Sequence, residues 1–213
     1  MSTTAEFAYR SLRKMVLNGE LAPGQRVSQL RIARELRCST VPVVEALRRL
    51  ESEGLFVKDP RKMARVRVIV AAEVEGLFLI RQALEMASAR LCAQRIEDEG
   101  IEQLKTLAEK FEHAAAGQDS RLADQLDMEI HLAIVRFARC PLLEQELDRL
   151  HLIERTVPGG LTSPVDWNTY RTSHNALIQA IAHRDPEAAE YLMKKHIDVG
   201  FRQMLDRAHL DAK

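Results

Sequence analysis

The stretch from Val27 to Val70 constrains the fold of this chain more than any other part of the sequence. Apolar residues at helical spacing predict a short amphipathic helix at 30–36, followed by a tight connection. Ser39 suits an N-cap, and Pro42 then falls in the first turn of the next helix, where its missing N–H costs little. Gly54 marks the end of that helix. The stretch therefore predicts two short helices joined by a tight turn.

A basic hairpin follows the second helix. Strands are expected at 55–58 and 64–70, on either side of Asp59-Pro60-Arg61-Lys62. Apolar and basic residues alternate in the second strand, in the period-two pattern of a half-buried strand: Ala64, Arg65, Val66, Arg67 and Val68. Two short helices followed by a basic hairpin indicate a winged helix-turn-helix, which places a helix in the major groove of DNA.

The charge distribution supports this interpretation. The formal net charge of the chain is zero, which by itself argues against nucleic-acid binding. Residues 1–70, however, contain 14 Lys and Arg against 7 Asp and Glu, whereas residues 71–213 contain 17 against 24. A basic N-terminal third joined to an acidic remainder fits a DNA-binding domain attached to a domain of another function.

The rest of the chain shows little strand signal. One helix is expected at Ala5–Asn18. After residue 70, breaks rich in Gly, Pro and Asp separate six predicted helices, at 72–96, 99–116, 119–138, 141–156, 165–183 and 186–208. The predicted fold class is mainly α, with an N-terminal winged helix-turn-helix domain at 1–70 and a C-terminal all-α six-helix bundle at 71–213.

The cysteines and the hydropathy pattern suggest a cellular location. Cys38, Cys92 and Cys140 form no Cys-x-x-Cys pair, which favours a reducing compartment. The sequence has no signal-peptide pattern and no apolar run of about 18 residues. We therefore expect a cytoplasmic protein that does not enter a membrane.

Four residues have the spacing of a metal site. Asp127 and His131 lie four residues apart, so they share one helix face and can reach a common atom. His174 and His196 fall on two later helices, each with an apolar stripe. A single helical histidine is more often a core or surface group. One carboxylate and three imidazoles converging from three helices, however, suit a borderline divalent metal. Spacing alone leaves both interpretations open.

Several motifs occur in order along nearly the whole chain. The N-terminal ones are Gly19-Glu20-Leu21-Ala22-Pro23-Gly24, Ser39-x-x-Pro42-Val43-x-Glu45-Ala46-Leu47-Arg48-Arg49-Leu50 and Glu53-Gly54-Leu55. The C-terminal ones are Arg81-x-x-Leu84-Glu85, Asp127-x-x-x-His131, His174-x-x-Leu177-x-x-Ala180-Ile181-x-x-x-Asp185-Pro186-Glu187-Ala188-Ala189 and His196. This layout resembles the GntR family of bacterial transcription regulators, and its second half is similar to the FCD ligand-binding domain.

The resemblance implies a site in the C-terminal domain. The residues that match the family's metal ligands are Asp127, His131, His174 and His196. The sequence does not distinguish among Zn, Ni, Mn and Fe as the divalent metal ion. Arg81 resembles the arginine with which the family helps to grip an effector's carboxylate, a task that suits a guanidinium fork. The alternative is a surface arginine paired with Glu85 one helical turn later.

Residues of the N-terminal domain are candidates for contacts with DNA. Ser39 and Thr40 stand at the start of the second helix, where base edges are within reach. Candidate phosphate contacts are Arg48, Arg49, Arg61, Lys62, Arg65 and Arg67. The chain departs from common family residues at Leu30, Thr40, Val44 and Met63, so the operator sequence does not follow from the resemblance.

These observations predict a DNA-binding transcription regulator, a repressor rather than an enzyme. It is expected to bind double-stranded operator DNA as a homodimer, under the control of a small carboxylate or hydroxy-acid effector at the metal site. Two alternatives remain open. One is a metal-dependent hydrolase, although no general base with a distinctive motif is evident. The other is a regulator whose metal only holds the helices together.

Overall fold

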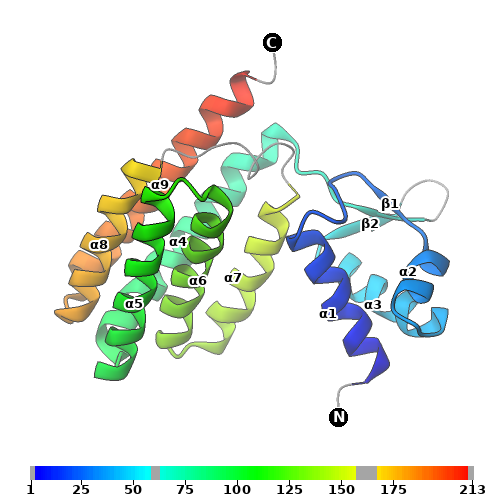
Figure 1. The fold of residues 1–213 in the computed structure, drawn as a ribbon, viewed down its shortest axis with the longest axis horizontal. Helices are drawn as coiled ribbons and strands as arrows, with labels where there is room; N and C mark the ends of the chain where they lie inside the picture. The colour runs from blue at the N-terminus through cyan, green and yellow to red at the C-terminus, as the bar shows by residue number, and fades with distance from the viewer. Residues whose placement is uncertain (1–2, 59–62, 157–166, 211–213) are drawn as a thin grey trace. The chain divides into compact units, whose positions relative to one another are not determined.

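The computed structural model describes residues 3–58, 63–156 and 167–210, and most of these residues are helical (Figure 1). The chain divides into two compact units. The first comprises Met1–Val74 with Arg149–Leu161, and the second comprises Glu75–Asp148 with Thr162–Lys213. Two helices, α4 (Ala71–Arg95) and α7 (Pro141–Glu154), contribute residues to both units.

The first unit has the predicted winged helix-turn-helix fold. Its elements are α1 (Thr4–Leu17), β1 (Arg26–Val27), α2 (Gln29–Glu35), α3 (Thr40–Ser52), β2 (Phe56–Lys58) and β3 (Ala64–Val66). The buried stripe of α3 consists of Val43, Ala46, Leu47 and Leu50. Gly54 follows α3 with φ of +80°, a conformation that favours glycine. The helix-turn-helix and the end of its second helix were therefore predicted correctly.

The sheet differs from the prediction in two respects. It has three antiparallel strands in the order β1-β3-β2, and β1 was not predicted because two residues are too few to show an alternating pattern. β3 also ends at Val66 instead of residue 70. Val68, expected on the buried face, is 38% exposed, because the chain has left the sheet before this position. The next buried residue, Ile69, donates its N–H to the carbonyl of Thr156 at 3.2 Å.

The end of α7 contributes to the core of the first unit. Leu152 belongs to the same cluster of buried residues as the apolar side chains of α1, α3 and the sheet. Ile153 is also buried, and its Cδ1 lies close to Gly54. The sequence assigns this helix to the C-terminal bundle, and the structure adds its last turns to the packing of the N-terminal unit.

The second unit contains the predicted helices of the C-terminal half, which are α5 (Asp98–Ala116), α6 (Ser120–Phe137), α8 (Trp167–Ala182), α9 (Pro186–Leu210) and most of α4 and α7. All six predicted helices are present, with ends within a few residues of those expected. α5 packs against α6 and α8, and α8 packs against α9 (Figure 1). These pairings bring residues distant in sequence to a common interior.

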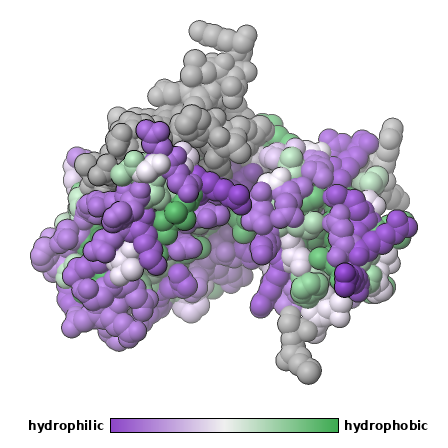
Figure 2. Space-filling model, viewed as in Figure 1, coloured by the Kyte–Doolittle hydropathy of each residue, from purple (hydrophilic) through white to green (hydrophobic). Residues whose placement is uncertain are grey.

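The surface is consistent with the charged composition. The face shown in Figure 2 is mostly hydrophilic, with small hydrophobic patches between hydrophilic residues. Among the described residues, no helix combines the length and the apolar character that crossing a bilayer requires.

Candidate metal centre

Three helices bring the four predicted ligands together inside the second unit. Asp127 and His131 lie one turn apart on α6, while His174 comes from α8 and His196 from α9. The three histidines are buried, and one ligand atom from each of the four residues lies within 4.8 Å of all the others. The packing of neighbouring helices thus brings residues up to 69 positions apart in sequence, Asp127 and His196, into one cluster.

The distances suit a single ion. Oδ1 of Asp127 lies 3.0 Å from Nε2 of His174 and 3.8 Å from Nε2 of both His131 and His196. The Nε2 atoms of His131 and His196 are 2.9 Å apart. Ligands bound to one ion at about 2.0–2.2 Å each are roughly 3 Å or a little more from one another. The arrangement therefore fits a three-nitrogen, one-oxygen site without large rearrangement.

One atom of the cluster has the surroundings that would suit a metal ion. Oδ1 of Asp127 is buried and receives no hydrogen bond from the described residues. Nε2 of His174 is near, but its direction does not meet the geometry of a hydrogen bond. A buried carboxylate oxygen without a donor is costly, and a metal ion at the centre of the cluster would satisfy it.

The cluster also changes the acidity of its members. Burial alone would raise the pKa of Asp127, but the contact with His174 and the charges of the neighbouring imidazoles hold it below its usual range. Burial opposes protonation of His131, yet the carboxylate of Glu85 raises the pKa of that ring. Burial and the two other rings lower the pKa of His196 well below its ordinary value. These shifts favour an anionic Asp127 and a neutral His196, the forms in which these two groups can bind a metal.

Glu85 also belongs to this site, although the sequence predicts it only as a partner of Arg81. It lies on the buried stripe of α4, and its side chain is 1% exposed. One carboxylate oxygen accepts from Nε of Arg81, and the other contacts Nδ1 of His131. The sequence does contain a signal for this role. Glu85 lies at helical spacing from Ala89 and Cys92, which are buried, and an acidic residue among buried ones needs a partner.

Arg81 lies beside the metal candidates but is already paired. Its side chain is 12% exposed and forms the ion pair with Glu85 that the alternative interpretation expected. It is not a surface arginine, however, because it is largely buried and belongs to the Glu85–His131 network. Its predicted contact with an effector stays a prediction.

The DNA-contact candidates occupy the N-terminal unit. Ser39 precedes α3, is exposed, and makes no capping hydrogen bond with its side chain; Thr40 begins α3 and is partly exposed. Arg48 is exposed on the same helix. Arg65 lies on β3 between the exposed Arg26 and Val57, on the face opposite the core. Arg61 and Lys62 lie outside the described residues.

Arg49 has a different environment from the other candidates. Its guanidinium lies over the ring of Tyr9, with 3.6 Å between Cζ and the ring centroid. It donates from Nη1 to Glu6 at 2.9 Å and from Nε to Glu53 at 3.2 Å. These contacts join α1 to α3, so any phosphate bound by Arg49 would compete with partners inside the unit.

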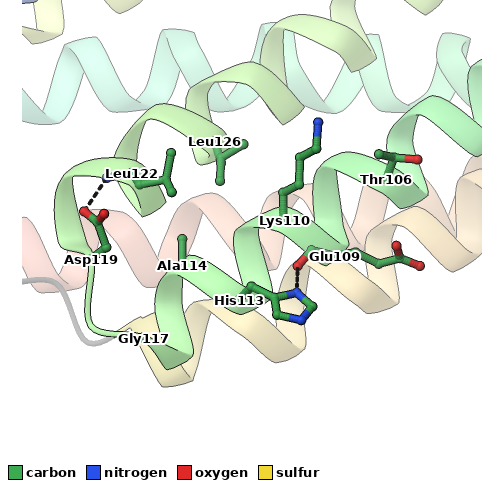
Figure 3. A pocket seen from close by; sticks show the side chains of 9 residues that line it. All are labelled: Thr106, Glu109, Lys110, His113, Ala114, Gly117, Asp119, Leu122 and Leu126. Carbon is green, nitrogen blue, oxygen red and sulfur yellow. Dashed lines mark hydrogen bonds between the residues drawn. The ribbon is translucent and has the colours of Figure 1, made fainter.

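A separate pocket lies between α5 and α6 (Figure 3). Its volume is about 600 Å³, and it is open to solvent. Its lining contains both polar and apolar residues: Thr106, Glu109, Lys110, His113, Ala114, Gly117, Asp119, Leu122 and Leu126. The carboxylate of Asp119 accepts the N–H of Leu122 at the start of α6, as Figure 3 shows, so it serves as a helix cap. None of the four metal candidates lines this pocket.

Comparison with known proteins decides the family. Residues 76–199, more than half of the chain, match the FCD domain, and residues 4–66 match the family described as bacterial regulatory proteins, gntR family. The chain belongs to the GntR family. It is therefore a DNA-binding transcription regulator with an FCD domain, and its relatives are regulators rather than enzymes.

Individual relatives support this assignment over nearly their full lengths. The chain is 28% identical to the Nta operon transcriptional regulator of Aminobacter aminovorans, over 90% of each protein. It is also 28% identical to a probable D-xylose utilization operon transcriptional repressor of Paenarthrobacter nicotinovorans, over 85% of this GntR chain and 80% of that protein. The structure of E. coli McbR/YncC has the same fold, with a TM-score of 0.82 at 22% identity, covering 95% of this chain and 99% of that one.

Proposed function

We propose that this GntR protein is a repressor whose FCD domain holds one divalent metal ion and responds to a small organic acid bound at that ion. The ligands would be Asp127, His131, His174 and His196. The convergence of these four groups in a buried cluster, within 4.8 Å of one another, is the observation that carries the proposal. When bound, the ion would supply a Lewis-acidic centre for a carboxylate.

The protein's own residues would determine how such an acid binds. Asp127 and the three imidazoles provide four ligands, so an expanded coordination shell has room for an oxygen of water or of a carboxylate. Arg81 is the candidate for a second contact with the acid, because it belongs to the same network through Glu85. To contact an acid, it would use guanidinium N–H groups other than the Nε that donates to Glu85.

At the other end of the chain, the winged helix-turn-helix would bind operator DNA. Ser39 and Thr40 would lie near base edges, while Arg48, Arg61, Lys62 and Arg65 would contact phosphates. Two copies in a homodimer would recognise two halves of a near-palindromic site, since a two-fold axis would relate both protein and DNA. Repression agrees with the name of the Paenarthrobacter relative, a probable transcriptional repressor.

A purely structural metal is the second candidate function. The observation that favours it is the ion pair between Arg81 and Glu85, which engages the arginine expected to bind the effector. In this case the metal would stabilise the packing of α6, α8 and α9, and no acid would alter DNA affinity. The hydrolase alternative is set aside, because the family consists of transcription regulators.

The test measures acid binding with and without DNA. An operator duplex is first selected from a random pool by the metal-loaded wild-type protein. Small mono-, di- and hydroxycarboxylic acids are then titrated by calorimetry into the protein, free and bound to this duplex. A switch requires an acid whose affinity differs between the two states. Arg81→Ala should weaken acid binding. Arg90→Ala is the matched control, because Arg90 lies on the same helix but pairs with Glu187 and Glu190.

Two results would contradict the proposal. If the purified protein binds no divalent metal, the site has another purpose. If an acid binds equally well with and without the duplex, the metal is structural and the second candidate function is correct.

A further inference from the structure

We infer that Glu85 is the positioning residue of the metal centre, orienting His131 so that its Nε2 faces the metal. The inference rests on the proposed metal site and extends it beyond the four ligands. Glu85 would not touch the ion. It would act through His131, with Arg81 holding its other carboxylate oxygen.

The position of Glu85 requires an explanation. A carboxylate is rarely fully buried, because removing its charge from water is costly unless close partners compensate. Glu85 is nevertheless among the most buried of the described polar residues, on the face of α4 that also buries Ser88, Ala89 and Cys92. An apolar side chain would pack on this face at lower cost. The retention of a charge here therefore points to a function that needs the charge.

The contacts of Glu85 show what that function is. Its two carboxylate oxygens are divided between two donors, Arg81 on its own helix and Nδ1 of His131 on α6. Because a carboxylate only accepts hydrogen bonds, Nδ1 of His131 must carry the proton. In a neutral ring this leaves the lone pair on Nε2, and Nε2 is the atom that faces His196 and Asp127. Glu85 thus fixes both the tautomer and the ring orientation that a metal ligand needs.

The role of Arg81 follows from the same contacts. Its Nε donates to Glu85, so the guanidinium partly neutralises the buried carboxylate and restricts its rotation. The chain of contacts Arg81–Glu85–His131 therefore links the predicted effector-binding arginine to a metal ligand. An acid that contacts Arg81 would act on the ion through this chain as well as directly.

Loss of the carboxylate should weaken metal binding. Partners that hold the second nitrogen of a metal-bound histidine typically contribute 10–100-fold to metal affinity. We expect Glu85→Leu, which removes both the charge and the hydrogen-bond acceptor, to weaken binding by roughly that factor. Glu85→Gln keeps an acceptor oxygen without the charge, so its affinity should lie between those of Glu85→Leu and the wild type.

The experiment measures the affinities of Zn²⁺ and Ni²⁺ for the full-length protein by competition with a chromophoric chelator. Ser88→Ala is the matched control: Ser88 is buried on the same helix, and its hydroxyl donates only to the carbonyl of Leu84, at 2.9 Å. Its metal affinity should equal that of the wild type. Nitrogen-15 NMR of the imidazoles gives a second readout, since in the metal-loaded wild type Nδ1 of His131 should carry the proton.

The outcomes separate this inference from the function on which it depends. If the wild type binds neither metal, the proposed metal site is wrong, and the inference falls with it. If the wild type binds metal and both Glu85 variants bind it equally well, only the positioning role is overturned. Circular dichroism checks that each variant folds, and Glu85→Gln decides the matter if Glu85→Leu does not fold.

Discussion

Glu85 and Glu53 show how the surroundings of a glutamate decide its use in this protein. Glu53, at the end of α3, accepts hydrogen bonds from Tyr9 at 2.9 Å and from Arg49 at 3.2 Å near the surface of the N-terminal unit. Such partly exposed pairs contribute little to stability individually. Glu85 is enclosed, and its partners are a buried arginine and a metal-ligand candidate. The same carboxylate thus joins helices in one place and orients a ligand in the other.

At the residue scale, the first prediction concerns His174. It is buried, its ring lies 4.5 Å from that of Phe111 between centroids, and its Nε2 approaches Asp127. His174→Ala should lower the metal content from about one equivalent per chain to a small fraction of that, because structural sites depend on each ligand. Metal analysis of the purified protein, with and without added Zn²⁺, measures the change.

His113→Ala provides the control for this prediction. His113 is exposed on α5, and its Nδ1 contacts the carbonyl of Glu109, so it should not affect the metal. Full metal occupancy in the His174 variant would show that the ion, if present, is held elsewhere.

Part of the site could be predicted from individual residues, and part could not. The i, i+4 spacing of Asp127 and His131 places both on one helical face in any regular helix. The role of Glu85 depends on which helix packs against α4, and its own sequence neighbourhood does not contain that information. The same holds for Arg49, whose partner Tyr9 lies on another helix. Contacts between elements were the missing information.

At the element scale, the contacts of α7 likewise could not be predicted from its own sequence. Its helical pattern was correctly predicted, but a single helix with apolar residues does not reveal which core receives each end. Leu152 packs in the core of the N-terminal unit. The backbone N–H of Ile69 also donates to the carbonyl of Thr156, just after α7. β1 was missed for a related reason, because its pairing with β3 involves only two residues. Short pairings and shared helices are determined by tertiary structure more than by local pattern.

Leu152→Ala should therefore destabilise the DNA-binding unit, even though the residue lies far from it in sequence. Removing a buried leucine leaves a cavity and costs about 2–5 kcal/mol. We expect faster hydrogen exchange of the amides in 4–66, together with a lower melting temperature. Leu142→Ala on the same helix is the control: Leu142 is 75% exposed, and its loss should change stability by less than about 0.5 kcal/mol. Equal effects of the two variants would contradict the assignment of Leu152 to this core.

The wing, the hairpin formed by β2 and β3, gives a second prediction at this scale. Arg65 lies on the outer face of the sheet beside Arg26, where a phosphate contact is proposed. Arg65→Ala should weaken binding to all DNA sequences alike and reduce the slope of log affinity against log salt by about 1, the value for one lost phosphate contact. Fluorescence anisotropy at several salt concentrations measures the slope. Lys105→Ala, on α5 and paired with Glu102, should leave it unchanged. An unaltered slope for Arg65→Ala would exclude this phosphate contact.

At the scale of the whole molecule, control of DNA binding requires a coupling free energy between the two sites. α4 contains elements of both. Its first turn includes Glu73, which pairs with Arg67 after the wing and accepts the N–H of Val70 at 3.2 Å. Further along the same helix are Arg81 and Glu85; Glu85 contacts His131, one of the metal candidates, and Arg81 pairs with Glu85. A change in the position or rigidity of α4 would therefore affect both the Glu73–Arg67 pair and the Arg81–Glu85 pair.

The last prediction tests this route. Metal and acid together should change operator affinity by about 5–150-fold, the usual range for such coupling, and operator should change acid affinity by the same factor. Glu73→Gln removes the charge that pairs with Arg67, so it should reduce both factors toward one while metal affinity stays unchanged. Glu75→Gln, an exposed neighbour on α4, should preserve the coupling. Undiminished coupling in the Glu73 variant would mean that the signal does not depend on this contact, and α7, the other helix shared by both units, would become the element to test.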